Sequence, residues 1–120
     1  MIVAMLVAAS IIHGDFDRDG RSDSARVVRT KHGSAITVTR ANGQRETVYN
    51  GTIGDLYLAI NTDRGWIRTA CGKGYDVSCS NRSPNRIRLH GGELLFGERE
   101  SSDFVLLYRA GHFQVVQLTD

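Results

Sequence analysis

The chain has 120 residues, which suits one domain and leaves too little chain for two hydrophobic cores of ordinary size. It is 41% hydrophobic and 23% charged with a formal net charge of +2, which excludes a disordered tail, a collagen-like repeat and a strongly basic nucleic-acid module. Thirteen glycines, one proline and short apolar runs favour strands joined by tight turns.

The N-terminal segment from Met1 to Ile12 is apolar apart from Ser10 and has no charged side chain. It is too short to span a bilayer, but its length suits the apolar region of an export signal, and Val7-Ala8-Ala9 suits a small-residue cleavage site. A basic segment in front of it is missing, so two interpretations remain. Residues 1–9 are the remnant of an export signal before a single domain of residues 10–120, or the segment is a buried first strand.

Short strands with alternating apolar residues follow in chain order. Asn42-Gly43 predicts a hairpin with a type I′ turn, in which both turn residues need positive φ. Ala110-Gly111 predicts another hairpin, and the strand before it is apolar on both faces, which predicts burial on both sides. The region from Cys71 to Asn85 lacks apolar periodicity and reads as a long structured loop. The predicted strands are Ser24–Arg29, Ala35–Arg40, Arg45–Tyr49, Leu56–Ile60, Trp66–Ala70, Arg86–His90, Glu93–Phe96, Asp103–Arg109 and His112–Leu118.

These strands predict an all-β fold. We expect an antiparallel sandwich or barrel-like sheet of about eight or nine strands with hairpin connections, and no helix outside the N-terminal segment.

An acidic loop between Gly14 and Ala25 is the most specific local signal. Its carboxylates alternate along the chain, so they can converge on one hard cation when the loop wraps round it, and calcium fits such a set. The alternative is that the Asp and Gly residues only mark a turn. The candidate ligands are the side chains of Asp15, Asp17, Asp19 and Asp23 and the backbone carbonyl of Arg21, with Gly20 permitting the sharp turn.

This loop resembles the calcium loop of FG-GAP and VCBS-type repeats, in which a strand follows the loop. An EF-hand needs a bidentate Glu at position 12, where this chain has Arg26, so a helix-loop-helix is not expected. In the FG-GAP pattern the Asp at position 9, here Asp23, takes the place of that ligand. A full propeller needs several blades and on the order of hundreds of residues. We therefore expect a structural calcium site in a lone sheet.

Two cysteines, Cys71 and Cys79, bound a short segment. Their spacing fits neither a zinc site nor a Cys-x-x-Cys redox motif, and no second pair completes a metal tetrahedron. We expect a disulfide, which implies an oxidising compartment and hence a periplasmic or secreted protein. The alternative is two unpaired small residues in a cytosolic protein.

Cys71-Gly72-Lys73-Gly74-Tyr75 has the spacing of the Ser-Gly-x-x-Tyr motif with which bacterial periplasmic lysozyme inhibitors enter the lysozyme cleft. The chain also resembles, in general plan, the periplasmic immunity proteins that protect bacteria from peptidoglycan hydrolases delivered by type IV or type VI secretion. One departure matters, because the serine position is Cys71, which has no hydroxyl to donate if it is in a disulfide.

The chemistry of this loop permits an inhibitory role. A glycosidase cleft has two carboxylates, and the Lys73 ammonium, the glycine N–H groups and the Tyr75 hydroxyl are complementary donors. A disulfide would reduce the ordering entropy lost on binding. The alternative is that Gly72 and Gly74 only permit a tight turn, with Tyr75 packed on the sheet.

Elements of catalysis are missing from the sequence, which has no Gly-x-Ser-x-Gly elbow, phosphate loop or His-x-x-x-His pair, so we expect a protein that is not an enzyme. Arg82, Arg86 and Arg88 can form a basic stripe, but aromatic residues are not interleaved with them and nucleic-acid binding is not expected. The four histidines are dispersed near turns and strand ends: His13, His32, His90 and His112.

The sequence thus predicts an exported calcium-binding protein that inhibits a lysozyme-like peptidoglycan hydrolase or a secreted effector of that kind. The alternative is a calcium-stabilised FG-GAP-like structural or adhesion module without inhibitory activity. We expect no stable membrane span, and the oligomeric state stays open.

Overall fold

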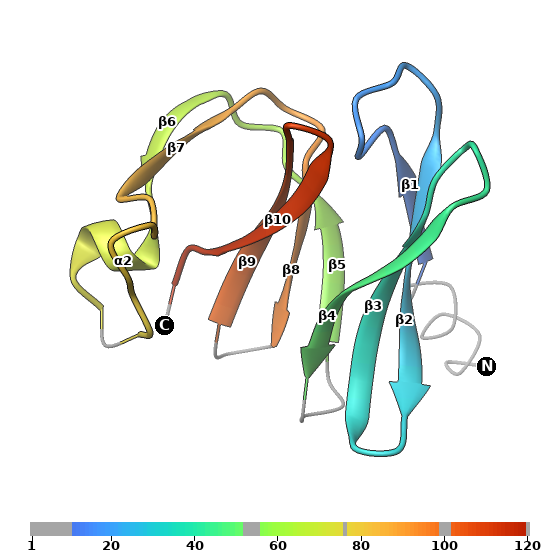
Figure 1. Cartoon of the computed structure of the whole chain (residues 1–120), viewed down its shortest axis with the longest axis horizontal. Helices are drawn as coiled ribbons and strands as arrows, with labels where there is room; N and C mark the ends of the chain where they lie inside the picture. The colour runs from blue at the N-terminus through green and yellow to red at the C-terminus, as the bar shows by residue number, and fades with distance from the viewer. Residues whose placement is uncertain (1–10, 52–55, 76, 99–101, 120) are drawn as a thin grey trace.

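The computed structural model describes residues 11–51, 56–75, 77–98 and 102–119 (Figure 1). Over these residues the strands form antiparallel sheets of four, four and two strands, which confirms the all-β prediction. The sheets are layered and not closed into a barrel. The strands are β1 (Ile11–Gly14), β2 (Asp23–Thr30), β3 (Gly33–Thr39), β4 (Arg45–Gly51), β5 (Leu56–Ile60), β6 (Gly65–Arg68), β7 (Arg86–Leu89), β8 (Leu94–Glu98), β9 (Ser102–Arg109) and β10 (His112–Gln117).

The described strands exceed the predicted eight or nine because β1 was not predicted as a separate strand. Among the described strands it pairs with β2 alone, and Ile11 is 37% exposed, so β1 is the edge strand of its sheet. Of the segment Met1–Ile12, for which a buried first strand is the alternative, only Ile11 and Ile12 belong to the described residues. Residues 1–9, the expected export remnant, lie outside the described residues.

The first sheet runs β1-β2-β3-β4, and each strand pairs with the next one in sequence. Its β3–β4 hairpin turns at Asn42-Gly43, as predicted. In this turn only Gly43 has positive φ, at 94°, and the Arg40 N–H donates to the Gln44 carbonyl at 2.7 Å. The connection is therefore longer than a two-residue type I′ turn, and the predicted turn type is wrong.

The second sheet has the order β10-β9-β8-β5, in which β8, β9 and β10 follow one another in sequence and β5 pairs with β8. Its β9–β10 hairpin turns at Ala110 and Gly111, with φ of 52° and 82°, and both hairpin residues have the positive φ of a type I′ turn. Between β5 and β8 the chain leaves this sheet to form the β6–β7 pair.

A short helix, α2 (Ala70–Lys73), interrupts the predicted strand Trp66–Ala70. Thr69 ends the extended run because its side chain caps the helix, accepting a hydrogen bond from the Gly72 N–H at 3.1 Å. The prediction of no helix beyond the N-terminal segment is therefore wrong. The rest of the predicted long loop has no strand among its described residues up to Asn85.

Two hydrophobic cores lie on opposite faces of the second sheet. The first packs that sheet against β1–β4, and Phe96, Ile36 and Leu94 are its largest fully buried members. The second packs it against the β6–β7 pair and contains Ile87 and Leu89. The central strand β9 supplies both cores with alternate residues, which confirms its predicted burial on both sides.

Candidate functional site

The acidic loop connects β1 to β2, and it brings three of the predicted ligands together. One carboxylate oxygen from each of Asp15, Asp17 and Asp19 lies within 4.8 Å of the others. The loop is curled by its own hydrogen bonds, because Asp15 accepts the N–H groups of Asp19 at 3.1 Å and Gly20 at 2.8 Å. Gly20 has φ of 87°, the left-handed conformation that its predicted role in the turn requires. The cluster can hold a metal ion.

Asp23 does not belong to this cluster. Its side chain is buried, and its Oδ2 accepts the N–H groups of Phe16 at 2.8 Å and Asp17 at 3.1 Å. Its Oδ1 accepts the N–H of Ala41 at 2.9 Å, which ties the loop to the β3–β4 turn. In this structure Asp23 holds the backbone of the acidic loop in place through these hydrogen bonds, and a ligand role for it stays a prediction.

Arg21 contacts the cluster through its N–H and its guanidinium. The N–H donates to Asp19 Oδ1 at 2.8 Å, and the guanidinium lies 3.5 Å from Asp19 Oδ2. The predicted ligand atom, its carbonyl oxygen, stays a prediction.

Burial raises the pKa of Asp17 to about 6, and the nearby charge of Asp23 adds to this rise. Asp19 is exposed, and hydrogen bonding from the Arg21 backbone lowers its pKa. Because the folded-state pKa of Asp17 lies above its usual 3.8, the protonated carboxyl favours folding, and this contribution is lost as the pH rises through about 6. At neutral pH the loop therefore holds an ionised carboxylate that a bound cation would stabilise.

Arg40 is a residue of this region that the sequence did not reveal. Its Nε lies 3.6 Å from Asp17 Oδ2, and its side chain is 16% exposed. Its guanidinium also lies over the rings of Tyr108 at 5.0 Å and Phe113 at 5.1 Å. Arg40 thus links the acidic loop to the β9–β10 hairpin, a contact between segments for which a single sequence has no local signal.

The cysteine-bounded loop follows α2, and Cys71 and Cys79 form the predicted disulfide. Gly72 is required by packing, because a Cβ there would lie 1.8 Å from the Asn85 carbonyl oxygen. Gly74 ends the helix with φ of 79°. Both glycines therefore have structural roles, and disulfide-bonded Cys71 has no free thiol to donate.

Lys73 and Tyr75 differ in their contacts with the rest of the protein. The Lys73 ammonium donates to the Leu118 carbonyl at 3.0 Å and lies 5.4 Å from the centre of the Tyr75 ring. Tyr75 is 42% exposed and is not packed on the sheet as a core residue. The loop thus presents Tyr75, whereas Lys73 is hydrogen-bonded to Leu118, just after β10.

The two predicted sites are not brought together. Figure 1 shows α2 and the β1–β2 loop at opposite ends of the long axis of the molecule. Among the described residues, no helix is long and apolar enough to cross a membrane.

Comparison of the chain with protein-family models, with curated proteins and with solved structures returned no match.

Proposed function

We propose that this chain is an exported binding protein whose acidic loop is stabilised by calcium. The observation that supports it most directly is the convergence of the Asp15, Asp17 and Asp19 carboxylates within 4.8 Å. Hard oxygen ligands in a flexible loop favour Ca²⁺, whereas Zn²⁺ and Cu²⁺ prefer sites with nitrogen or sulfur ligands. The disulfide supports an oxidising compartment outside the cytosol.

Calcium is expected to raise the melting temperature of the protein, because an ion that binds only the folded state stabilises it by mass action. At free calcium one hundred times Kd the gain is about 2.7 kcal/mol, which corresponds to a shift on the order of 10 °C for a domain of this size. Thermal melts in calcium, magnesium and chelator measure it. Asp19→Asn should lose most of the shift, because Asp19 is exposed and offers its carboxylate to the cluster.

Asp63→Asn is the matched control for this experiment. Asp63 is also exposed but lies in the turn after β5, outside the cluster. It should retain the full calcium shift. Equal melting temperatures of the wild type in calcium and in chelator, with no heat of binding, would contradict the calcium proposal.

Inhibition of a lysozyme-like hydrolase is the activity we propose for the cysteine-bounded loop. The supporting observation is an exposed Tyr75 on a segment that the disulfide closes, since a rigid loop loses little entropy on entering a cleft. Lys73 would have to exchange its hydrogen bond to the Leu118 carbonyl for a carboxylate of the enzyme. Without this activity, the same chain would act as a calcium-stabilised structural or adhesion module.

Tyr75→Ala is expected to weaken inhibition of a susceptible hydrolase by about tenfold to a hundredfold, because interface tyrosines concentrate binding energy. Lys73→Ala should have a comparable or larger effect if its ammonium meets a carboxylate. Lys31→Ala is the control, since Lys31 is exposed in the β2–β3 turn. The measurement is lysis of peptidoglycan by a panel of lysozyme-type enzymes. Failure to inhibit any of them, or equal inhibition by the Tyr75 and Lys73 double variant, would favour the structural module.

A further inference from the structure

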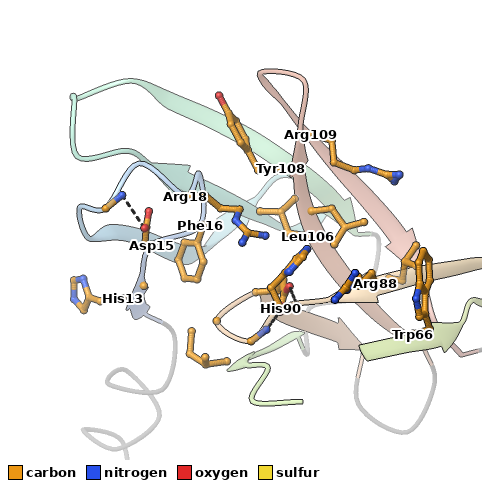
Figure 2. A pocket seen from close by; sticks show the side chains of 18 of the residues that line it. His13, Asp15, Phe16, Arg18, Trp66, Arg88, His90, Leu106, Tyr108 and Arg109 are labelled. Atoms are coloured by element: carbon orange, nitrogen blue, oxygen red, sulfur yellow. Dashed lines mark hydrogen bonds between the residues drawn. The ribbon is translucent and has the colours of Figure 1, made fainter. Parts of the chain in front are cut away.

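A groove of about 660 Å³ lies between the acidic loop, the β6–β7 pair and the middle of β9 (Figure 2). Phe16, Ile60 and Leu106 give it apolar surface. Four arginines line it, from the acidic loop, from β7 and from the end of β9, namely Arg18, Arg86, Arg88 and Arg109. Its volume lies in the range of ordinary ligand pockets.

Positive charge outweighs negative charge in this groove. The four arginines face two carboxylates, Asp15 and Glu93, each of which accepts two backbone N–H groups, at 3.1 and 2.8 Å for Asp15 and at 2.7 and 3.0 Å for Glu93. Within the described part of the chain, the guanidinium groups of Arg18, Arg88 and Arg109 form no ion pair or hydrogen bond. These cations are therefore available to an anion.

The backbone conformation of Arg18 is an independent observation that favours a binding role for its side chain. Arg18 has φ of 61°, in the left-handed region where glycine is the favoured residue. Figure 2 shows its side chain extending from the loop toward the part of the groove where Arg88 and His90 lie. A long cationic side chain at a position that suits glycine is an outlier of the kind that clusters at ligand sites.

Trp66 stands at the far end of the groove from the acidic loop (Figure 2). Its side chain is 59% exposed, although tryptophan is usually well buried. The Arg86 guanidinium lies 4.8 Å from the centre of its ring, a cation–π contact that restrains the indole. An exposed and restrained aromatic ring is a surface on which the C–H face of a sugar can pack.

We propose that this groove binds an anionic saccharide, with Arg18 and Arg88 contacting its carboxylate or sulfate groups and Trp66 packing against a sugar ring. Guanidinium groups match carboxylate and sulfate oxygens with paired hydrogen bonds. A single-stranded nucleic acid fits less well, because its bases need successive aromatic platforms and Trp66 is the one exposed ring among the phenylalanine, tyrosine and tryptophan side chains that line the groove. The proposal does not depend on the calcium site or on hydrolase inhibition.

The test is calorimetric titration of the protein, at fixed calcium, with an oligogalacturonide and with a sulfated oligosaccharide, which separates the two sources of negative charge. Arg88→Gln is expected to weaken binding of the preferred anion about tenfold or more, and Trp66→Ala by a similar factor. Arg18→Gly should weaken binding while folding as well as the wild type or better, because glycine adopts its backbone conformation freely. Arg29→Gln is the control, since Arg29 is exposed on β2 outside the groove.

Several results would overturn the proposal. They are no binding of either anionic saccharide, equal binding of neutral maltotriose, unchanged affinity in Arg88→Gln, or binding of polyglutamate in preference to both saccharides. Because Arg88 lies on β7, outside the acidic loop, its variant loses the anion without altering the calcium shift. The two proposals can therefore fail separately.

Discussion

Replacing Asp23 by alanine is expected to lower the free energy of unfolding by about 3 to 5 kcal/mol, in chelator as well as in calcium. The carboxylate is 2% exposed and accepts N–H bonds from Phe16, Asp17 and Ala41. Its removal leaves these donors without their partner, and each buried unpaired donor costs about 1 to 3 kcal/mol. Urea unfolding in the two buffers measures the loss.

Asp23→Asn and Asp19→Asn are the informative comparisons. Asn keeps one acceptor oxygen at position 23, so it should lose less stability than alanine. Asp19→Asn should leave stability in chelator near that of the wild type, because Asp19 is exposed. If Asp23→Ala unfolded like the wild type in chelator and lost only the calcium effect, Asp23 would be a ligand and not the support that its hydrogen bonds indicate.

The strands were predictable because their signals are local. Alternation identified β3, and the doubly apolar pattern of β9 correctly indicated that both faces are buried. The helix α2 was missed because its four residues include a cysteine and a glycine, and it forms through the Thr69 cap and contact with Asn85. No period of 3.6 can show in so short an element.

The candidate site shows the same division between local and long-range order. The spacing of Asp15, Asp17 and Asp19 was enough to predict their convergence, because all three lie on one turn of chain. The bond from the Ala41 N–H to Asp23 spans 18 residues, and the bond from Lys73 to the Leu118 carbonyl spans 45. Hydrogen bonds between residues so far apart in the chain depend on how the sheets pack, and no short stretch of sequence carries a signal for that packing.

A carboxylate lies at the start of one strand in each four-stranded sheet. Asp23 is the first residue of β2, and Glu93 directly precedes β8, after the chain has passed through β6, α2 and β7. Glu93 accepts the N–H groups of His90 and Gly91 and the side-chain amide of Asn61. Although burial works to raise the pKa of Glu93, these hydrogen bonds outweigh it and lower the pKa. Glu93 thus ties the turn after β5 to the turn between β7 and β8.

Phe96→Ala is expected to lower the free energy of unfolding by about 3 to 5 kcal/mol, because it empties the centre of the first core. Phe96 is fully buried, and its ring stacks on Phe104 with 5.5 Å between ring centres. It also lies 5.1 Å from the ring of Tyr49, which belongs to the other four-stranded sheet. Phe96→Leu should lower the free energy of unfolding much less than Phe96→Ala, because leucine is larger than alanine and leaves a smaller cavity.

The same variant tests whether the layers unfold together. Trp66 is the only tryptophan and lies on β6, in the β6–β7 pair that the second core packs against the second sheet. Because Leu106 and Val105 of β9 belong to different cores, loss of the first core should also release the second. Trp66 fluorescence and far-UV circular dichroism of Phe96→Ala should therefore give coincident transitions, both shifted from the wild type. A fluorescence midpoint that stays at the wild-type value while the dichroism midpoint shifts would mean that the β6–β7 layer holds to the central sheet independently of the first core.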